Sequence, residues 1–155
     1  MLEAFVAGHH AGRNLYIWGG DDSEAAEAIR RLPYAALDVT ALAPDPTECP
    51  RPDAEARALL VRRLEEALNN MASSSQPFAA ILIRGAPLLA RYGVGLRPFY
   101  PFVGDRRLIL IAIPRPPFPN ELNNPPRGLT FDPGRVSAML EDIAGKDHVV
   151  EVTER

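Results

Sequence analysis

Hydrophobic residues gather along the chain in short continuous runs, and longer segments with helical spacing separate these runs. This pattern is typical of an α/β protein with buried parallel strands. Four runs predict strands, because each is rich in apolar residues. They cover residues 14–18, 34–42, 78–83 and 108–113. A shorter run at 149–152 predicts a final strand, with 129–131 as the alternative.

Helical spacing of apolar residues fills the segments between these strands. Leu60, Leu64, Leu68 and Met71 recur three to four residues apart, which predicts a helix over residues 54–71 with one apolar side. The other predicted helices cover residues 1–10, 23–32, 86–92 and 132–143. The segment that follows residue 92 is expected to be a connection with little helix.

Alternating strands and helices predict a three-layer α/β fold, with a mostly parallel sheet of about five strands and helices on both faces. The chain has 155 residues, which fits a single domain over 1–155. A hydrophobic fraction of 46% is sufficient for a core.

Charge and cysteine content indicate which partners and which cellular compartment to expect. The net charge of -3 gives no bulk attraction to nucleic acid or to anionic membranes, so we expect neither as a direct partner. Cys49 is the single cysteine and cannot form an internal disulfide. Residues 1–12 lack the basic start of a signal peptide, and no apolar run approaches the roughly 18 residues of a membrane span. We therefore expect a soluble, cytoplasmic protein.

The first strand is preceded by a short helix and followed by Gly19-Gly20 and a second helix. This order resembles the start of an AAA+ module of the P-loop ATPases, over about residues 1–114. The resemblance implies that residues 78–83 form the strand before the acid of the metal site. It also implies that residues 108–113 form the sensor strand.

The residues that perform ATP chemistry in this family are missing. A P-loop requires G-x-x-x-x-G-K-[ST], whose amides and lysine hold the phosphates. Here the turn reads GGDDSEAA, so the lysine position falls on Ala25 or Ala26. The acid expected after the third strand is replaced by Arg84-Gly85. The sequence therefore predicts a degenerate P-loop-like domain without a cofactor; the alternative is a divergent site for ATP with magnesium.

In length and segment order the chain is also similar to the small P-loop proteins of bacteriophage-exclusion (BREX) defence systems. That resemblance implies a subunit of a phage-defence complex, with protein partners and a homo-oligomer as a further option. If a nucleotide does bind, a set of residues near the strand ends is expected to hold it: Gly19, Gly20, Ser23, Arg84 and Arg115.

Three acids follow the first strand and admit more than one interpretation. Asp21 and Glu24 have the spacing of a helix capping box. Asp21 and Asp22 could instead form a metal or phosphoacceptor site at the end of a strand, with Asp38 as the nearest further carboxylate. Metal-dependent phosphoryl transfer or nuclease activity is therefore a third hypothesis. Arg84 could pair with Asp21 or Asp22, or bind a phosphate or a partner's carboxylate.

Two segments could contact a partner. The first interleaves arginines with aromatic residues and contributes Arg97, Phe99 and Tyr100; its alternatives are packing of the aromatics into the core and nucleic-acid binding. The second is a proline-rich stretch over residues 114–133, which is either a strip that partners grip or a disordered insertion. Its anchors would be Arg115, Phe118, Leu122 and Arg127.

No complete catalytic motif is present. The sequence contains neither the G-x-S-x-G of a nucleophile elbow nor a G-x-G-x-x-G after a strand. His9, His10, His148 and Cys49 do not have zinc-ligand spacing, so surface or capping roles are expected for them and no metal. The leading hypothesis is a non-catalytic, ATPase-like subunit that binds other proteins.

Overall fold

The structure is a computed structural model of the chain, and it describes residues 2–8, 14–43, 47, 53–74, 78–104, 106–113 and 149–151. The strands are β1 (Leu15–Gly19), β2 (Tyr34–Asp38), β3 (Ala80–Arg84), β4 (Leu108–Ile113) and β5 (Val149–Glu151). The α-helices are α1 (Leu2–Val6), α2 (Asp22–Ala28), α3 (Asp53–Ala72) and α4 (Pro87–Arg91). Two 3₁₀ helices, η1 (Val39–Leu42) and η2 (Arg97–Phe102), complete the described elements.

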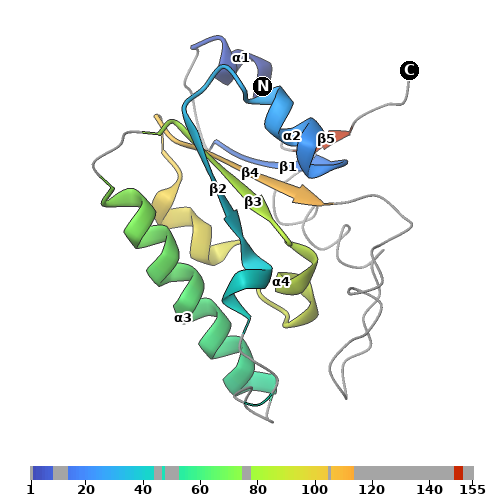
Figure 1. The fold of residues 1–155 in the computed structure, drawn as a ribbon, viewed down its shortest axis with the longest axis vertical. Coiled ribbons are helices and arrows are strands. Elements are labelled where there is room, and N and C mark those ends of the chain that lie inside the picture. Colours follow the sequence, from blue (N-terminus) through green and yellow to red (C-terminus); the bar gives the residue numbers. More distant parts are fainter. Residues whose placement is uncertain are drawn as a thin grey trace.

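The strands form one parallel sheet in the order β2-β3-β4-β1-β5 (Figure 1). The four strands β1 to β4 pair over four or five residues each, and β5 adds three residues along the free side of β1. The prediction of an α/β protein with a parallel sheet is confirmed. Every residue of β4 is buried, which explains why its sequence, LILIAI, is apolar throughout rather than alternating.

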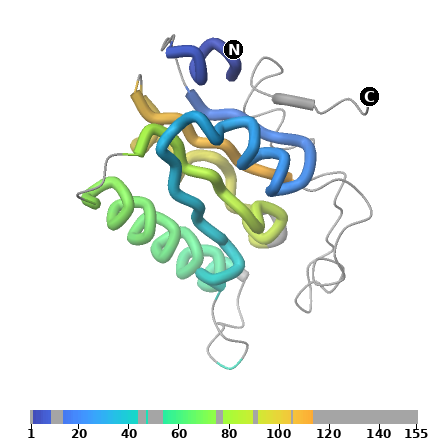
Figure 2. The backbone as a smooth tube through the Cα atoms, turned by 45° about the horizontal axis from the view of Figure 1, so that its top comes forward, coloured from blue at the N-terminus to red at the C-terminus, as the bar shows by residue number. Residues whose placement is uncertain are grey.

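Helices cover the two faces of the sheet and create two separate parts of the core (Figure 2). One face packs against α3, α4, η1 and η2. The other face packs against α1 and α2, with Phe5 and Ile29 as its large buried side chains. Alternate residues of each central strand therefore belong to different parts of the core.

The helix α3 lies along one face of the sheet, and its burial follows directly from the sequence spacing. Ala56, Leu60, Leu64 and Leu68 lie four residues apart and are at most 2% exposed. Burying each leucine contributes roughly 1.5–3 kcal/mol. Leu60, Leu64 and Leu68 were predicted as the apolar stripe of this helix, and the predicted bounds differ from the observed ones by one residue at each end.

Several predicted elements differ from the observed ones; the predicted helix 1–10, for example, is observed as Leu2–Val6. The predicted strand 34–42 is too long, because the Asp38 carboxylate accepts the Thr40 N–H and the chain turns into η1. The predicted helix 23–32 is observed as Asp22–Ala28. The segment after residue 92, which was expected to contain little helix, includes the 3₁₀ helix η2, and η2 has a proline near its N-terminus. The predicted helix 132–143 and the alternative strand 129–131 lie outside the described residues.

Asn14 is the buried polar residue of the core, with 1% of its surface exposed. Its side-chain amide donates to the Gly104 carbonyl at 2.8 Å, and its own carbonyl accepts the Ile109 N–H at 2.8 Å. These bonds join the start of β1 to the start of β4. Among the described residues, no helix combines the length and the hydrophobicity that crossing a membrane requires.

Candidate functional site

The carboxyl ends of the parallel strands meet at one edge of the sheet, which is where α/β proteins usually place ligands. We call this region the carboxyl edge; it consists of the turn after β1, the end of β2 and the end of β3. The turn contributes Gly20 and Asp22, β2 contributes Asp38, and β3 contributes Arg84. Asp38 and Arg84 are direct neighbours in the parallel register.

The turn after β1 is held by its own hydrogen bonds. The Gly20 N–H donates to the Ile113 carbonyl at 3.0 Å, which fixes the turn against the end of β4. Asp21 is the N-cap of α2, and the Glu24 carboxylate accepts the Asp21 N–H at 3.1 Å. The capping interpretation of these two acids is therefore confirmed, and no additional ligand is needed to satisfy that N–H.

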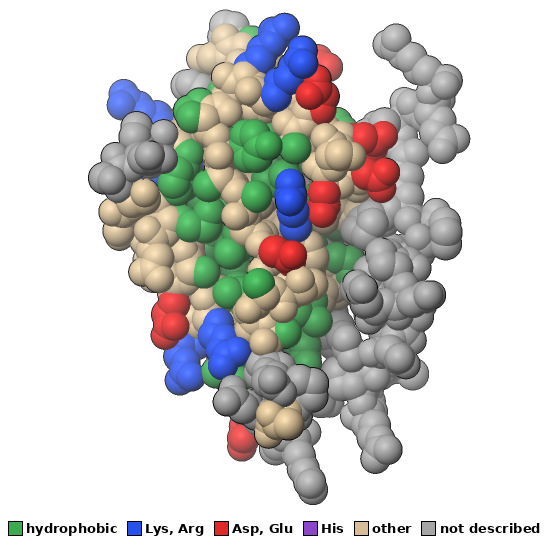
Figure 3. Space-filling model, viewed as in Figure 1, with side chains coloured by type: hydrophobic (Ala, Val, Ile, Leu, Met, Phe, Trp, Pro, Cys, Tyr) green, Lys and Arg blue, Asp and Glu red, His purple; other side chains and the backbone are tan. Residues whose placement is uncertain are grey.

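Asp22 and Arg84 form an ion pair across the carboxyl edge. The Arg84 Nε lies 3.9 Å from an Asp22 carboxylate oxygen, and both side chains are a little less than half exposed. One of the two interpretations of Arg84, an internal pair with Asp21 or Asp22, is thus observed. In Figure 3, acidic and basic side chains lie next to one another on the visible face.

The pKa of Asp22 is raised above the ordinary aspartate value, chiefly because burial disfavours its charged form. The positive charge of Arg84 lowers the pKa in part, whereas the negative charges of Asp38 and Asp21 raise it. The carboxyl edge is therefore already crowded with negative charge.

Asp38 and Gly85 both lie against Thr40 on the other side of the carboxyl edge. The Asp38 carboxylate accepts hydrogen bonds from the Thr40 N–H at 2.9 Å and from the Thr40 hydroxyl at 2.6 Å. Gly85 has a φ of +68°, and a Cβ there would lie 2.8 Å from Thr40 Cγ2 and 2.9 Å from Asp38 Oδ1. Only glycine fits this turn, because it must adopt a left-handed conformation and pack tightly.

Two buried donors near these turns have no hydrogen-bond partner in the described part of the chain. They are the indole Nε1 of Trp18 and the Nε of Arg84. A Cβ at Gly20 would lie 2.9 Å from Trp18 Nε1 and 2.6 Å from Glu24 Oε2, so the indole N–H lies close to the turn. A buried donor without a partner costs about 1–3 kcal/mol.

The structure brings together most of the residues predicted to hold a nucleotide. Gly19, Gly20 and Arg84 all lie at the carboxyl edge, and Ser23 is exposed in the first turn of α2. Arg115 lies outside the described residues. Within the described ranges, no three histidine, cysteine or acidic side chains are arranged to hold a metal ion, and this includes Asp21, Asp22 and Asp38.

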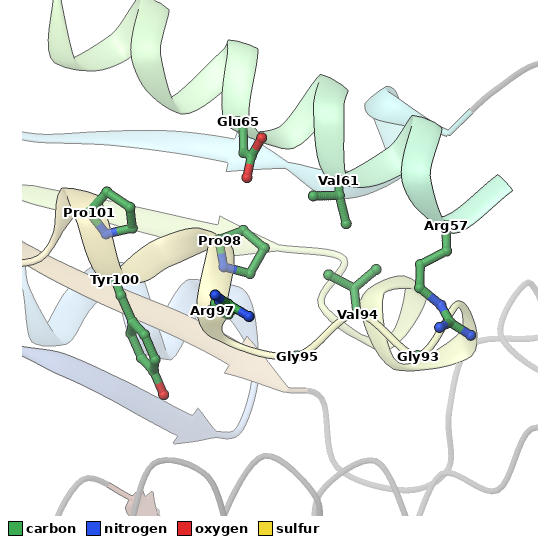
Figure 4. A pocket seen from close by; sticks show the side chains of 10 residues that line it. All are labelled: Arg57, Val61, Glu65, Gly93, Val94, Gly95, Arg97, Pro98, Tyr100 and Pro101. Atoms are coloured by element: carbon green, nitrogen blue, oxygen red, sulfur yellow. The ribbon is translucent and has the colours of Figure 1, made fainter. Parts of the chain in front are cut away.

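A second region is the groove between α3 and η2, which we call the α3–η2 groove (Figure 4). It has a volume of about 500 Å³. Arg57, Val61 and Glu65 line it from α3, one turn of the helix apart. The opposite wall comes from the segment before η2 and from η2 itself: Gly93, Val94, Gly95, Arg97, Pro98, Tyr100 and Pro101.

The wall of the α3–η2 groove is fixed by one long-range hydrogen bond. The Arg57 Nε donates to the Tyr92 carbonyl at 2.7 Å, which ties the first turns of α3 to the chain before η2. Gly93 follows with a φ of +67°, and a Cβ there would have Arg57 Nη2 as its nearest neighbour at 3.4 Å. This turn is therefore more open than the one at Gly85.

The predicted partner residues divide into two groups in this region. Arg97 is exposed and Tyr100 is 38% exposed, and both line the groove. Phe99 is fully buried against the α3 side of the core, so its side chain packs inside, as the core-packing alternative stated. Four further predicted anchors lie outside the described residues: Arg115, Phe118, Leu122 and Arg127.

The sequence did not reveal the contribution of α3 to the groove. Arg57, Val61 and Glu65 were not predicted to contact a partner. Val61 adds a half-buried apolar side chain next to Leu60. Such an apolar residue at the border of a helical stripe is the one signal that could have indicated a second contact.

Comparisons of the chain with family models, with curated proteins and with solved structures returned no match.

Proposed function

We propose that this chain is a non-catalytic, ATPase-like scaffold that acts by binding other proteins. The observation that carries the proposal is the Asp22–Arg84 ion pair. It occupies the carboxyl edge, where the phosphates of a nucleotide would lie in a P-loop protein. The site is thus filled by the protein's own charges, and Asp22 and Asp38 oppose a further anion.

The strand order supports a P-loop-like scaffold. The order β2-β3-β4-β1-β5 differs from the Rossmann order 3-2-1-4-5-6 and from the flavodoxin order 2-1-3-4-5. It inserts β4 between β1 and β3. AAA+ modules insert their sensor strand in the same way, between the P-loop strand and the strand of the metal site. The proposal therefore treats β4 as the former sensor strand.

The positions of the missing residues support the loss of ATP chemistry. Ala25, one of the two residues at the lysine position, is fully buried in the core between α2 and the sheet. A lysine there would bury its charge rather than reach a phosphate. Arg84 stands at the position of the metal-site acid and repels a cation.

The α3–η2 groove is the proposed binding surface for a protein partner. Arginine and tyrosine are the side chains most enriched in interface hot spots, and Arg97 and Tyr100 are exposed beside two prolines. No ion pair to Arg97 is seen within the described ranges, so its charge is free to meet an acidic group. A subunit of a larger assembly, such as the phage-defence complex that the resemblance implies, would use this surface.

Partner capture tests the proposal. Proteins from the cell of origin that bind the immobilised chain are compared for the wild type, Arg97→Glu, Tyr100→Ala and the control Arg62→Glu. Arg62 is exposed on α3 outside the groove. The expected result is a partner retained by the wild type and the control and lost with both groove variants. Equal retention by all four proteins would contradict the assignment of the groove.

A second candidate function is binding of a small anion or a nucleotide at the carboxyl edge. Two observations favour it: the buried donors Trp18 Nε1 and Arg84 Nε, which have no partner among the described residues. If this candidate is correct, Arg84→Ala abolishes binding of ATP with magnesium and of inorganic phosphate alike. Equilibrium dialysis with either ligand measures this directly.

A further inference from the structure

The strand β2 lies at one end of the sheet and pairs with β3 on one side only. In Figure 1 it lies at the front of the sheet, and Figure 3 shows hydrophobic side chains in the same region of the surface. Its residues alternate between exposed and half-buried, with Tyr34 39% exposed. Within the described residues, no other strand pairs with the outer edge of β2.

The register shows which backbone groups of β2 point outward. The Ala80 N–H donates to the Pro33 carbonyl at 3.3 Å, and Ala80 is the register partner of Tyr34. In a parallel ladder the backbone groups of alternate residues point to the same side. Residues 33, 35 and 37 are therefore directed to β3, and Tyr34, Ala36 and Asp38 are directed away from it. These three outward residues are also the three exposed ones.

The outer edge of β2 lacks the features by which proteins usually protect a free edge. Such features are lysine, proline, an inward charge or a bulge. Pro33 directly precedes β2, and Asp38, its last residue, is charged; the segment Tyr34–Leu37 between them has the sequence YAAL with no charged residue or proline, and its register with β3 is continuous. The two alanines at its centre leave the backbone open to close approach.

We propose that β2 is a self-association site, at which two copies of this chain pair their β2 strands in antiparallel orientation about a two-fold axis at Ala36. In this register Ala36 exchanges two hydrogen bonds with Ala36 of the second copy. Tyr34 exchanges two backbone hydrogen bonds with Asp38 of the second copy. Asp38 of the first copy exchanges two more with Tyr34 of the second copy. The total is about six backbone hydrogen bonds, two for each of three pairs.

A second copy is the proposed occupant because the exposed face of β2 is complementary to itself. Antiparallel pairing places the Tyr34 hydroxyl of each copy beside the Asp38 carboxylate of the other, and cross-strand neighbours of this kind stabilise a sheet. The two Asp38 residues are four strand positions apart, about 13 Å at 3.4 Å per residue. That separation exceeds the Debye length of roughly 8 Å in physiological salt.

The interface predicted from these residues is small. Pairing along one strand of 5 residues buries much less than the roughly 1,200 Å² of a standard interface. We therefore expect an association that depends strongly on protein concentration. The proposal is independent of the partner surface proposed above, because it uses a different edge of the molecule.

Site-directed cross-linking tests both the association and its register. In a Cys49→Ser background, Ala36→Cys places the two thiols across the two-fold axis, where Cα atoms about 5.5 Å apart are within disulfide range. Tyr34→Cys is the matched control, because its two copies would lie about 13 Å apart. The expected result is a cross-linked dimer that forms with Ala36→Cys, and at least fivefold less with Tyr34→Cys.

Sedimentation at increasing concentration provides the second measurement. The wild type is expected to shift from monomer toward dimer, whereas Ala36→Lys stays monomeric with an unchanged unfolding midpoint, because Ala36 is exposed. A wild type that stays monomeric at every concentration would overturn the proposal, and so would equal cross-linking of the two cysteine variants. Binding of an unrelated extended peptide at β2 by a monomeric wild type would assign the edge to a different occupant.

Discussion

The carboxyl edge and the α3–η2 groove each contain an arginine and a glycine turn, and the two glycines have nearly the same φ. Gly85 has a φ of +68° and Gly93 a φ of +67°. At the carboxyl edge the arginine is paired with Asp22 and the turn is packed against Thr40. In the groove Arg97 is exposed and the turn has room around it. The same elements thus form a closed site in one region and an open one in the other.

This difference indicates where the molecule can accept a ligand without rearrangement. A ligand at the carboxyl edge must displace an ion pair and enter a region of negative charge. A ligand in the groove meets an arginine and a tyrosine that are both exposed. We therefore propose that a partner binds at the α3–η2 groove rather than at the carboxyl edge.

The largest expected effect separates the two glycine turns. Gly85→Ala is expected to cost about 3 kcal/mol of unfolding free energy, from the left-handed conformation together with close contacts to Thr40 and Asp38. Gly93→Ala has the same conformational cost without such contacts, about 1–2 kcal/mol. Urea unfolding of the two variants measures the difference. Equal losses would show that the carboxyl edge is as open as the groove.

A second prediction concerns the hydrogen bond that fixes the groove. Arg57→Ala removes the bond to the Tyr92 carbonyl and is expected to cost about 1 kcal/mol. Arg62→Ala, an exposed arginine on the same helix, is expected to change stability by less than about 0.5 kcal/mol. Urea unfolding midpoints compare the two. If Arg57→Ala is neutral, the groove wall is held by apolar packing alone.

Much of the fold could be predicted from the sequence, because the pattern of apolar residues reflects which side of each strand and helix is buried. The apolar run of β4 and the leucine spacing of α3 leave few alternatives. The end of β2 could not be predicted, because one side-chain bond from Asp38 to Thr40 turns an otherwise strand-like segment into η1. Propensity cannot anticipate such a local bond.

The candidate sites were predicted only in part, because they depend on contacts that form in the folded chain. A pair of Arg84 with Asp21 or Asp22 was one of the predicted alternatives, since the carboxyl ends of parallel strands meet at one edge of the sheet; the structure shows the pair with Asp22. The groove was not expected, because its two walls are more than 30 residues apart in sequence and meet through Arg57 and Tyr92. Phe99 and Tyr100 are adjacent and similar, yet only the tertiary fold decides that one is buried and the other exposed.

The smallest expected effect is a pH dependence at the carboxyl edge. Because the pKa of folded Asp22 is raised, its contribution to stability is greatest below the ordinary aspartate pKa and is lost as pH rises through the raised value. The unfolding free energy of Asp22→Asn is therefore expected to decrease less over that pH range than the unfolding free energy of the wild type. At neutral pH the variant is expected to be at least as stable as the wild type.

The control for this prediction is Glu55→Gln, which removes an exposed carboxylate on α3. Its stability is expected to follow that of the wild type across the same pH range. A loss of stability in Asp22→Asn at neutral pH would show the reverse balance, in which attraction to Arg84 outweighs the burial of Asp22.

The central claim is that the carboxyl edge is closed to nucleotides, and thermal unfolding with and without ATP and magnesium tests it most directly. A ligand that binds only the folded chain raises the unfolding midpoint by mass action. No shift of the unfolding midpoint is expected for the wild type at millimolar nucleotide. A magnesium-dependent rise that disappears in Arg84→Ala would contradict it, because the ion pair would then have given way to a working nucleotide site.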